Sequence, residues 1–518
     1  MAVELLNQSL CLSILWCLIL TMIVFKLIIR RSNNKLNLPP CPPKLPIIGN
    51  LHQIGGLSHR SLTSFSQKYG PLMLLQFGQI PTLVVSSANL VREMVTINDL
   101  AFSYRPSMTV PEIYFYGGKD VSLGPYGEDW RYKRKISVIE FLSLKKVRSF
   151  QFIREEEVSN MVNKIREACM KNNNVAVNLV RMVSATTWNI NFRCVFGKQY
   201  ETLDDKSNGF NEIVMKILTH FREFSFGDYF PSLWWMDFVT GLVPKVKANF
   251  REMDAFINHE IEQRKSGKKN TENKDFIDVL VQLQQDDDMP DVGLSLASIK
   301  TLITGMIIGG LEANATMVEW AMAELMRHPE KMKKAQEEVR RIAGKNNKSR
   351  KIIEENDVNQ MSYLKCVVKE ATRLHPPGPL LFPRQTNSST VKLGGYDIPP
   401  KTSVIINAWA IQRDPNLWEK PEEFIPERFE NNDVDFKSQD FGLIPFGFGR
   451  RICPGILFSV ATIEYTLVNL LYWFDWKLPA HNNENGKDDI DMNETDGLLS
   501  SMMLSLHLHP IPYVPLLP

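Results

Sequence analysis

The sequence predicts a mainly α-helical fold with a small β region, preceded by one N-terminal transmembrane helix. Three observations predict it: an uncharged apolar run over residues 9–25, apolar residues at helical spacing in several long segments, and a strand pattern over 71–87. The chain has 518 residues, 44% of them hydrophobic and 23% charged, which is enough for a large core. Because no Gly/Ser-rich linker divides it after residue 50, we expect one large domain behind an N-terminal appendage.

The apolar run SLCLSILWCLILTMIVF is extended by LII at 27–29, and a bilayer span takes about 20 apolar residues. A cleaved secretory signal would carry basic residues in front of its apolar core. Here the basic residues follow the run, which keeps the rest of the chain on the cytosolic side: Lys26, Arg30, Arg31 and Lys35. We therefore expect residues 1–30 to be an uncleaved membrane anchor, 31–50 a basic and proline-rich hinge, and 51–518 the globular domain.

Most of the globular domain reads as helix. Residues 71–87 predict two short strands around a Gly-Gln-Ile-Pro turn. Apolar spacing predicts helices over 128–149, 151–171, 208–222, 248–265, 296–327 and 329–343. We expect solvated loops around a short helix in 264–290, short strands in 378–406, and a largely irregular chain from 414 to 455. An irregular stretch of that length indicates a function or a fixed ligand.

Charge and cysteine content exclude some classes of protein. The formal net charge is +2, so nothing global indicates a nucleic-acid partner. The seven cysteines are odd in number and irregularly spaced, which does not fit a disulfide framework and suits a reducing compartment.

One cysteine lies in an unusual loop, PFGFGRRICPG, residues 445–455. Its glycines permit a close approach of the backbone to a flat or bulky group and leave amides free to bond a sulfur. Arg450, Arg451 and the start of a helix just after Pro454 should lower the pKa of the Cys453 thiol. We therefore expect Cys453 to act as an anion.

The loop pattern Phe446-x-x-Gly449-x-Arg451-x-Cys453-x-Gly455 resembles the haem-binding loop of the cytochromes P450. The resemblance extends along essentially the whole chain, because further motifs of the family follow in the right order. Trp130 and Arg134 look like its Trp-x-x-x-Arg, which contacts the haem propionates, and Arg384 matches another propionate contact. Glu370 and Arg373, three apart on one helical face, with Arg428 of PERF look like its buried charge network.

Within this family the hinge motif KLPIIGNLHQ, DFIDVL at 275–280 and VEWAMAELMRHP at 318–329 look like the plant enzymes of the 71 clan. The resemblance implies the cytochrome P450 fold and makes 51–518 a haem-thiolate catalytic domain, with haem b bound through Cys453 as the axial ligand of its iron. Electrons would come from NADPH through a cytochrome P450 reductase, and cytochrome b5 is a further candidate partner. The enzyme would sit in the endoplasmic reticulum membrane as a single-pass protein. Candidate reductase contacts are Arg131, Lys133, Lys135, Lys145, Lys146 and Arg148.

The stretch GGLEA, residues 309–313, departs from the family pattern. Glu312 supplies the usual acid, whereas Ala313 stands where the family has a threonine whose hydroxyl helps deliver a proton to bound oxygen. General acid help of this kind is worth roughly 10²–10⁴ in rate. Three groups are candidates to replace the missing hydroxyl: Asn314, Thr316 one turn along, or a hydroxyl or amine of the substrate. The equal alternative is an ordinary hydroxylase that tolerates Ala313.

Carry-over of the family's substrate-facing regions predicts a pocket that is nearly all apolar or aromatic and suits a small lipophilic substrate. Its residues would be Val110, Ile113, Tyr114, Phe115, Ile307, Ile308, Leu311, Leu380, Leu381 and Phe382. A terpenoid or a monoterpene indole alkaloid is the preferred substrate class, ahead of a phenylpropanoid. The exact substrate and the carbon attacked are not encoded in these motifs.

Three functions stay open at this point. The first is NADPH- and O2-dependent oxidation, with oxidative cyclisation, desaturation or aromatisation as outcomes that suit Ala313. The second is an isomerase or dehydratase that uses the haem without external electrons; the membrane anchor and the regular cysteine loop speak against it. The third, a non-enzymatic haem protein or scaffold, has no support beyond the missing threonine.

Overall fold

The computed structural model describes most of the globular part of the chain: residues 16–17, 20–21, 36–171, 176–199, 209–266, 274–285, 294–346, 353–437, 440–479 and 490–513. The predicted membrane anchor lies almost wholly outside these residues. Among them, the stretches Leu296–Arg327 and Ile456–Trp473 are long and apolar enough to cross a membrane by length and composition. Both take part in the hydrophobic core, so their apolar character is explained by burial inside the protein.

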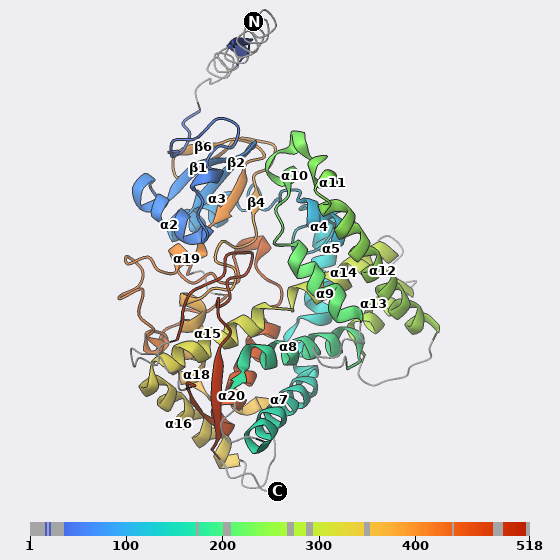
Figure 1. Cartoon of the computed structure of the whole chain (residues 1–518), viewed down its shortest axis with the longest axis vertical. Helices are drawn as coiled ribbons and strands as arrows, with labels where there is room; N and C mark the ends of the chain where they lie inside the picture. Colours follow the sequence, from blue (N-terminus) through green and yellow to red (C-terminus); the bar gives the residue numbers. More distant parts are fainter. Residues whose placement is uncertain are drawn as a thin grey trace, which may run out of the picture.

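The helices form the bulk of the molecule (Figure 1). In chain order the α-helices are α2 Ser58–Tyr69, α3 Ala88–Asn98, α4 Thr109–Tyr114, α5 Glu128–Ile136, α6 Leu144–Ser149, α7 Gln151–Lys171, α8 Leu179–Phe196, α9 Gly209–His220, α10 Phe226–Tyr229, α11 Met236–Val239, α12 Leu242–Ser266, α13 Phe276–Gln285, α14 Leu296–Gly309, α15 Ala313–Arg327, α16 Pro329–Asn346, α17 Glu355–Val358, α18 Ser362–Leu374, α19 Ala408–Ile411 and α20 Ile456–Trp473. Shorter helical turns are η1 Leu51–Gln53, η2 Ser137–Phe141, η3 Pro231–Leu233, η5 Pro426–Phe429 and η6 Gly449–Arg451.

The strands form small sheets at the edges of the helical body. They are β1 Leu72–Phe77, β2 Ile80–Val85, β3 Val177–Asn178, β4 Arg384–Gln385, β5 Val391–Leu393, β6 Tyr396–Ile398, β7 Ser403–Ile406, β8 Phe474–Lys477 and β9 His507–Pro512. The largest sheet has the order β1-β2-β7-β4, with β2 parallel to β7 and its other pairs antiparallel. Pairing of Arg384 with Val404 fixes that arginine at the sheet edge that faces the body.

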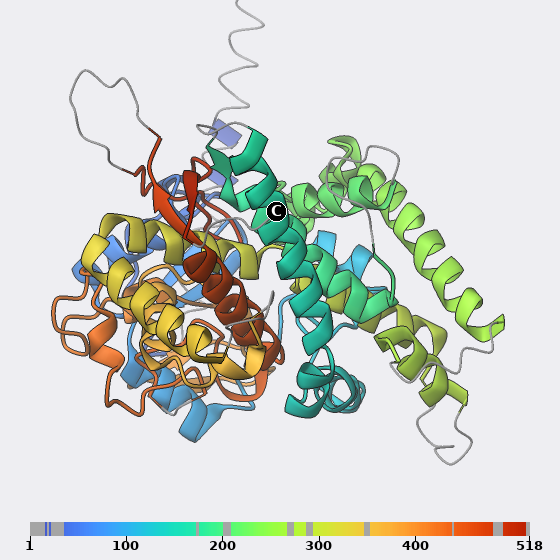
Figure 2. The same ribbon diagram turned by 90° about the horizontal axis from the view of Figure 1, so that it is seen from below.

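Two kinds of core hold these parts together. A large cluster joins α7, α8, α14, α15, α18 and α20, and a smaller one packs the β1–β2–β7 region against α3. Seen from below, α7 runs beside α20, which it contacts (Figure 2). Between these two parts the chain from 414 to 455 forms only short helical turns in its described residues, as the sequence predicted.

Several predicted elements are confirmed with close boundaries: the strand pair in 71–87, the helix 151–171, the short helix in 264–290 and the strands in 378–406. Two predicted helices are corrected. The segment 128–149 is divided by a π-helical turn at 137–141, and the segment 296–327 is interrupted at 310–312. Glycines at 309 and 310 permit the second interruption, which apolar spacing alone does not reveal.

Candidate cofactor site and active-site cavity

A cavity of about 330 Å³ lies between the cysteine loop and the α14–α15 segment. Its lining includes the predicted ligand Cys453 together with Phe446, Gly455 and three of the predicted arginines, Arg134, Arg384 and Arg451. On the opposite wall lie Glu312 and Ala313. The structure therefore brings the predicted cofactor residues and the predicted catalytic residues to one enclosed space.

The cysteine loop folds back on itself to present the sulfur. The amide of Cys453 donates to the carbonyl of Phe446 at 2.8 Å. Gly447 and Gly449 have φ angles of 75° and 61°, in the left-handed region that favours glycine. Gly449 does not line the cavity; a β-carbon there would lie 2.7 Å from Asp99 Oδ1, so this glycine shapes the loop from behind.

Cys453 is half-buried at the cavity wall. Desolvation raises the pKa of its thiol, opposed by the backbone N–H of Gly455 and by the charge of Arg134. The prediction that Arg450 and Arg451 lower this pKa is wrong for the protein alone. Arg450 pairs with Asp99 at 2.9 Å, and Arg451 donates to the carbonyls of Ser103 and Gly124. A coordinating metal deprotonates a thiol outright, so an iron bound at Cys453 would supply the driving force for a thiolate.

Four arginines gather on the cavity wall next to the cysteine, and sequence reasoning missed one of them, Arg105. Backbone carbonyls accept hydrogen bonds from each guanidinium. Arg105 donates to the carbonyls of Ser122, Phe382 and Pro383. Arg134 donates to that of Ile452, and Arg384 donates to those of Phe448 and Phe102. The motif FSYRP gave one signal for Arg105, a lone cation inside an otherwise uncharged segment.

Burial lowers the pKa values of these arginines, and neighbouring arginines lower those of Arg105 and Arg451 further. Burial, with help from neighbouring arginines, lowers the pKa of Arg451 to about 9, and burial lowers that of Arg384 to about 10. The pKa of Arg105 is also well below its usual range because of burial and of the charges of Arg384 and Arg451. Asp120 is the single carboxylate that lines this wall among the described residues. The cluster thus holds more positive than negative charge.

This arrangement fits the haem that the resemblance implies. A haem brings two propionate carboxylates, and a buried cluster of four guanidiniums around one carboxylate provides the charge to match them. Arg451 Nη1 is buried without a partner among the described residues, which marks a donor left for an anion. The residues that would hold the group are Cys453 at the iron and Arg105, Arg134, Arg384 and Arg451 at the propionates.

Trp130 supports this wall from behind and does not line the cavity. Its indole N–H donates to the carbonyl of Val121 at 2.8 Å. The guanidinium carbons of Arg451 and Arg134 lie 4.2 and 5.4 Å from its ring centroid. The tryptophan therefore positions both arginines through its ring face.

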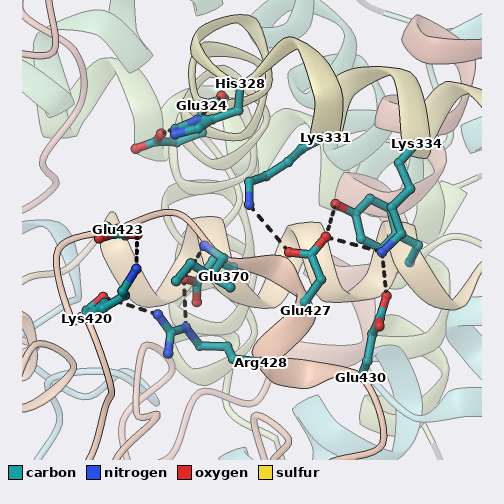
Figure 3. Close-up of polar contacts among 12 residues, drawn as sticks. Glu324, His328, Lys331, Lys334, Glu370, Lys420, Glu423, Glu427, Arg428 and Glu430 are labelled. Carbon is teal, nitrogen blue, oxygen red and sulfur yellow. Dashed lines mark hydrogen bonds and ion pairs between the residues drawn. The ribbon is translucent and has the colours of Figure 1, made fainter.

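A charge network joins α18 to the PERF turn, with Arg428 next to Glu370 (Figure 3). Arg373 donates to Glu370 through two nitrogens at 2.7 and 2.9 Å, and Arg428 Nε donates to Glu370 Oε1 at 2.9 Å. Glu370 and Arg373 are fully buried, and further nitrogens of Arg373 donate to the carbonyls of Gln412, Pro421 and Glu423. A buried ion pair this well satisfied ties α18 to the irregular chain that leads to the cysteine loop.

The opposite wall contains the α14–α15 interruption. Ala313, Asn314 and Met317 line the cavity, whereas Thr316 is buried outside it and only its backbone N–H donates, to Glu312. Asn314 is 3% exposed, and it lies next to Ala313 in the cavity lining. Of the two protein candidates for the missing hydroxyl, the structure brings Asn314 to the cavity and leaves Thr316 behind.

Glu312 is held by a residue that sequence reasoning missed. Arg222 Nη2 donates to the two carboxylate oxygens at 3.1 and 3.4 Å, and both side chains line the cavity. Burial raises the pKa of the Glu312 carboxyl, and the charge of Arg222 partly opposes the rise. This ion pair lies on a mainly apolar wall that also carries Asn191, Thr301 and Asn314.

Four predicted pocket residues line the cavity: Phe115, Ile308, Leu381 and Phe382. The other six do not line the cavity: Val110, Ile113, Tyr114, Ile307, Leu311 and Leu380. The Tyr114 hydroxyl, for example, bonds His220 and Asn249 away from the cavity. Further apolar side chains complete the wall: Val121, Leu123, Leu218, Phe221, Met306, Leu498 and Leu499.

Comparison with known proteins places the whole chain in one group. The family model described as Cytochrome P450 matches residues 39–500. The chain is 47% identical to a phenylacetaldehyde oxime monooxygenase from Prunus mume, over 93% of this chain and 91% of that protein. It is 43% identical to a desmethylyatein synthase from Sinopodophyllum hexandrum, over 97% and 98% of the two chains. It is 42% identical to a strychnine-11-hydroxylase from Strychnos nux-vomica, over 93% of each chain.

Proposed function

Because the chain belongs to the cytochrome P450 family, whose members are oxidoreductases of the monooxygenase class, we propose that it oxidises a lipophilic specialised metabolite with dioxygen and NADPH. One observation carries the proposal: Cys453 and the four-arginine cluster line the same largely apolar cavity. Haem b held there through the Cys453 thiolate supplies oxygen activation. The names of the relatives, an oxime monooxygenase, a synthase and an alkaloid hydroxylase, support a plant specialised metabolite.

The protein's own residues perform the remaining tasks. The four arginines bind the propionates, and the apolar wall binds the substrate and excludes water. Glu312 keeps a proton at its carboxyl more readily than an exposed acid because burial raises its pKa. Asn314 is positioned to order a water or a polar group of the substrate beside Ala313.

The preferred substrate is a terpenoid or monoterpene indole alkaloid that brings its own hydroxyl or amine to the side of the cavity lined by Arg222 and Glu312. Oxidative cyclisation, desaturation or aromatisation would then replace simple hydroxylation, because Ala313 offers no hydroxyl for proton delivery. Ordinary hydroxylation of a terpenoid or phenylpropanoid is the alternative that the names of the relatives favour. No contact in the cavity favours an electron-independent isomerase.

We place this enzyme at the endoplasmic reticulum membrane, with residues 1–30 as the anchor, 31–50 as the hinge and 51–518 as the catalytic domain in the cytosol. Exposed apolar side chains support contact with lipid: Ile47, Trp234, Trp235, Phe238 and Val239. They come together because the β1–β2 turn joins the hinge to the α10–α11 region. The Gly78 amide donates to Ile48, and that of Gln79 donates to Tyr229.

Electrons would arrive from a reductase, with cytochrome b5 as a further partner, at a basic surface on α5 and α6. Arg134 on α5 contacts the carbonyl of Ile452 at 2.7 Å, which puts this surface on the cysteine side of the cavity. Arg131, Lys135, Lys145 and Arg148 are exposed there and Lys146 is half-buried. Lys133 is corrected: it is buried, with its ammonium on Asp129 and the carbonyl of Lys119, so a partner cannot reach it.

The function is tested with microsomes from yeast that express the full chain and a plant reductase. They are given NADPH, heavy-isotope dioxygen and a panel of terpenoids, alkaloids and phenylpropanoids, and products are read by mass. A product that carries heavy oxygen establishes a monooxygenase, and a product formed by loss of hydrogen without label establishes an oxidative cyclase or desaturase. Product formation without NADPH would contradict the proposal and favour the isomerase.

A further inference from the structure

The interruption between α14 and α15 leaves backbone carbonyls that the helix itself does not satisfy. Gly310 and Leu311 bond back only three residues, to Ile307 at 3.3 Å and to Ile308 at 3.5 Å. Helical bonding resumes where the amide of Thr316 donates to Glu312 at 3.0 Å. A buried carbonyl without a donor costs free energy, so groups outside the helix must bind those released at the break.

Helix α8 supplies these donors. Trp188 Nε1 donates to the carbonyl of Leu311 at 2.6 Å, and Asn191 Nδ2 donates to that of Met306 at 3.1 Å. Asn191 Nδ2 also lies 3.2 Å from the carbonyl of Ile307, which accepts from Gly310 as well. The two side chains are three residues apart and therefore project from one face of α8. Both residues are buried, at 5% and 2% exposure.

The Asn191 side chain fills the space next to Gly310 at the break. A β-carbon added at Gly310 would lie 2.6 to 2.9 Å from three atoms of the Asn191 side chain, closer than real β-carbons approach such atoms. Asn191 also lines the cavity, together with Gly310 and Ala313. The amide thus fills the groove that a side chain at 310 would occupy, next to the substrate space.

Side chains of the break itself contribute no such bond. Ala313 has no hydroxyl, and Glu312, at the N-cap of α15, makes no capping bond because its carboxylate is paired with Arg222. We propose that Trp188 and Asn191 are positioning residues that hold the break open and so fix the cavity wall beside Ala313. The proposal rests on the function given above, because the wall matters only if that cavity is where oxidation occurs.

The proposal is tested with Asn191→Leu and Trp188→Phe in the full chain, reconstituted with haem and reductase. When the cavity wall beside Ala313 is no longer held in place, electrons from NADPH should reduce dioxygen without oxidising the substrate. NADPH, a proton and dioxygen then give NADP⁺ and hydrogen peroxide. Leaving a buried carbonyl unpaired costs enough to change such a partition by roughly 5-fold or more. We expect the peroxide released per NADPH consumed to rise by about that factor in each variant.

Asn189→Leu is the matched control. Asn189 lies on the same helix, but its amide donates to Glu157 at 3.3 Å, away from the cavity. It should lower thermal stability about as much as Asn191→Leu and leave the peroxide fraction unchanged. Equal peroxide fractions for the two asparagine variants would overturn the proposal and leave Asn191 a purely structural residue.

A second pair of variants probes the same contact without turnover. Gly310→Ala alone should fail to retain haem, whereas Gly310→Ala with Asn191→Ala should regain it, because the smaller side chain vacates the space. The haem absorption band of the double variant and its shift on ligand binding should still differ from wild type, since the donor is lost. A wild-type band would overturn the proposal even if no substrate of the panel is oxidised, so this result is independent of the proposed function.

Discussion

The two walls of the cavity are built in different ways. On the cysteine side, the four arginines of the wall are each held by backbone carbonyls, and the loop glycines adopt conformations that few other residues can. On the α14–α15 side, a mainly apolar surface includes the ion pair Arg222–Glu312 and Asn314. The first wall suits a bound cofactor, whose charges and iron ligand are always the same. The second wall is shaped by packing from α8 and α9. We therefore expect changes on the first wall to weaken cofactor binding. Changes at Arg222 and Asn314 on the second wall should affect the reaction and leave the cofactor in place.

The largest effect should follow loss of the sulfur. Cys453→Ala removes the iron ligand, and because residues that merely support a ligand are worth ~10–100-fold, we expect product formation to fall by more than ~100-fold. Cys366→Ala is the control, a buried cysteine on α18 that does not line the cavity, and it should retain activity. Substantial activity of Cys453→Ala would show that the cysteine wall is not the cofactor wall.

The next effect concerns the arginine cluster. Arg451→Leu removes a donor to the propionates, and we expect haem to dissociate roughly 10–100-fold faster. The stability of the haem-free protein should change little, because the loss of a buried cation next to Arg384 and Arg134 is offset by the loss of its bonds to the carbonyls of Ser103 and Gly124. Haem transfer to an acceptor protein and thermal unfolding measure the two. Arg450→Leu, whose partner Asp99 lies outside the cavity lining, should change neither by more than about twofold.

On the other wall, Asn314→Leu and Thr316→Val separate the two candidates for the missing hydroxyl. We expect Asn314→Leu to lower product formation by roughly 10- to 100-fold, at or below the usual range for general acid help, with haem content unchanged. Thr316→Val should have little effect, because its side chain does not reach the cavity. The reverse order in product yield would contradict this assignment.

Arg222→Leu should move the pH dependence of turnover. The pKa of Glu312 is already raised by burial and is held down only by Arg222, so removal of the guanidinium raises it further. Glu312 then keeps its proton to higher pH, and the alkaline limb of the kcat profile should shift upward. Lys216→Leu, on α9 just before Arg222 and paired with Glu212, should leave the profile in place. An unshifted profile of Arg222→Leu would exclude Glu312 as the proton source.

The smallest effect on activity is expected at Glu319, which lies on α15 outside the cavity and is 2% exposed. Burial raises its pKa from 4.5 to about 7, so the stability it contributes is present below pH 4.5 and is lost as the pH rises through 7. Glu319→Gln should therefore stabilise the protein by about 1–3 kcal/mol at pH 8 and not at pH 4.5. Thermal unfolding at the two pH values measures this, with exposed Glu337→Gln as the control.

The sequence predicted the cysteine wall better than its counterpart because that wall depends on residues with special chemistry. Cys453, Arg134, Arg384 and Arg451 were identified from motifs, and all four line the cavity. Arg105 was missed because a single arginine before a proline carries no spacing signal; only the folded chain shows the carbonyls that hold it.

Helix α8 illustrates the limit for the other wall. Its residues are buried on most faces, so it has no apolar stripe from which a helix could be predicted. The donors Trp188 and Asn191 therefore went unnoticed, as did the break at 310–312 that they bind. Likewise, six of the ten predicted pocket residues do not line the cavity, because the direction of a side chain depends on the folded backbone, which short motifs do not determine.

The central claim is that Cys453 binds haem iron as a thiolate in this cavity. The most direct test is the absorption spectrum of the reduced carbon monoxide complex of the full chain in microsomes. We predict the long-wavelength Soret band that thiolate ligation gives, absent from Cys453→Ala and present in Cys366→Ala. A band typical of imidazole or other neutral ligation in the native wild-type protein would contradict the claim, as would an unchanged spectrum for Cys453→Ala.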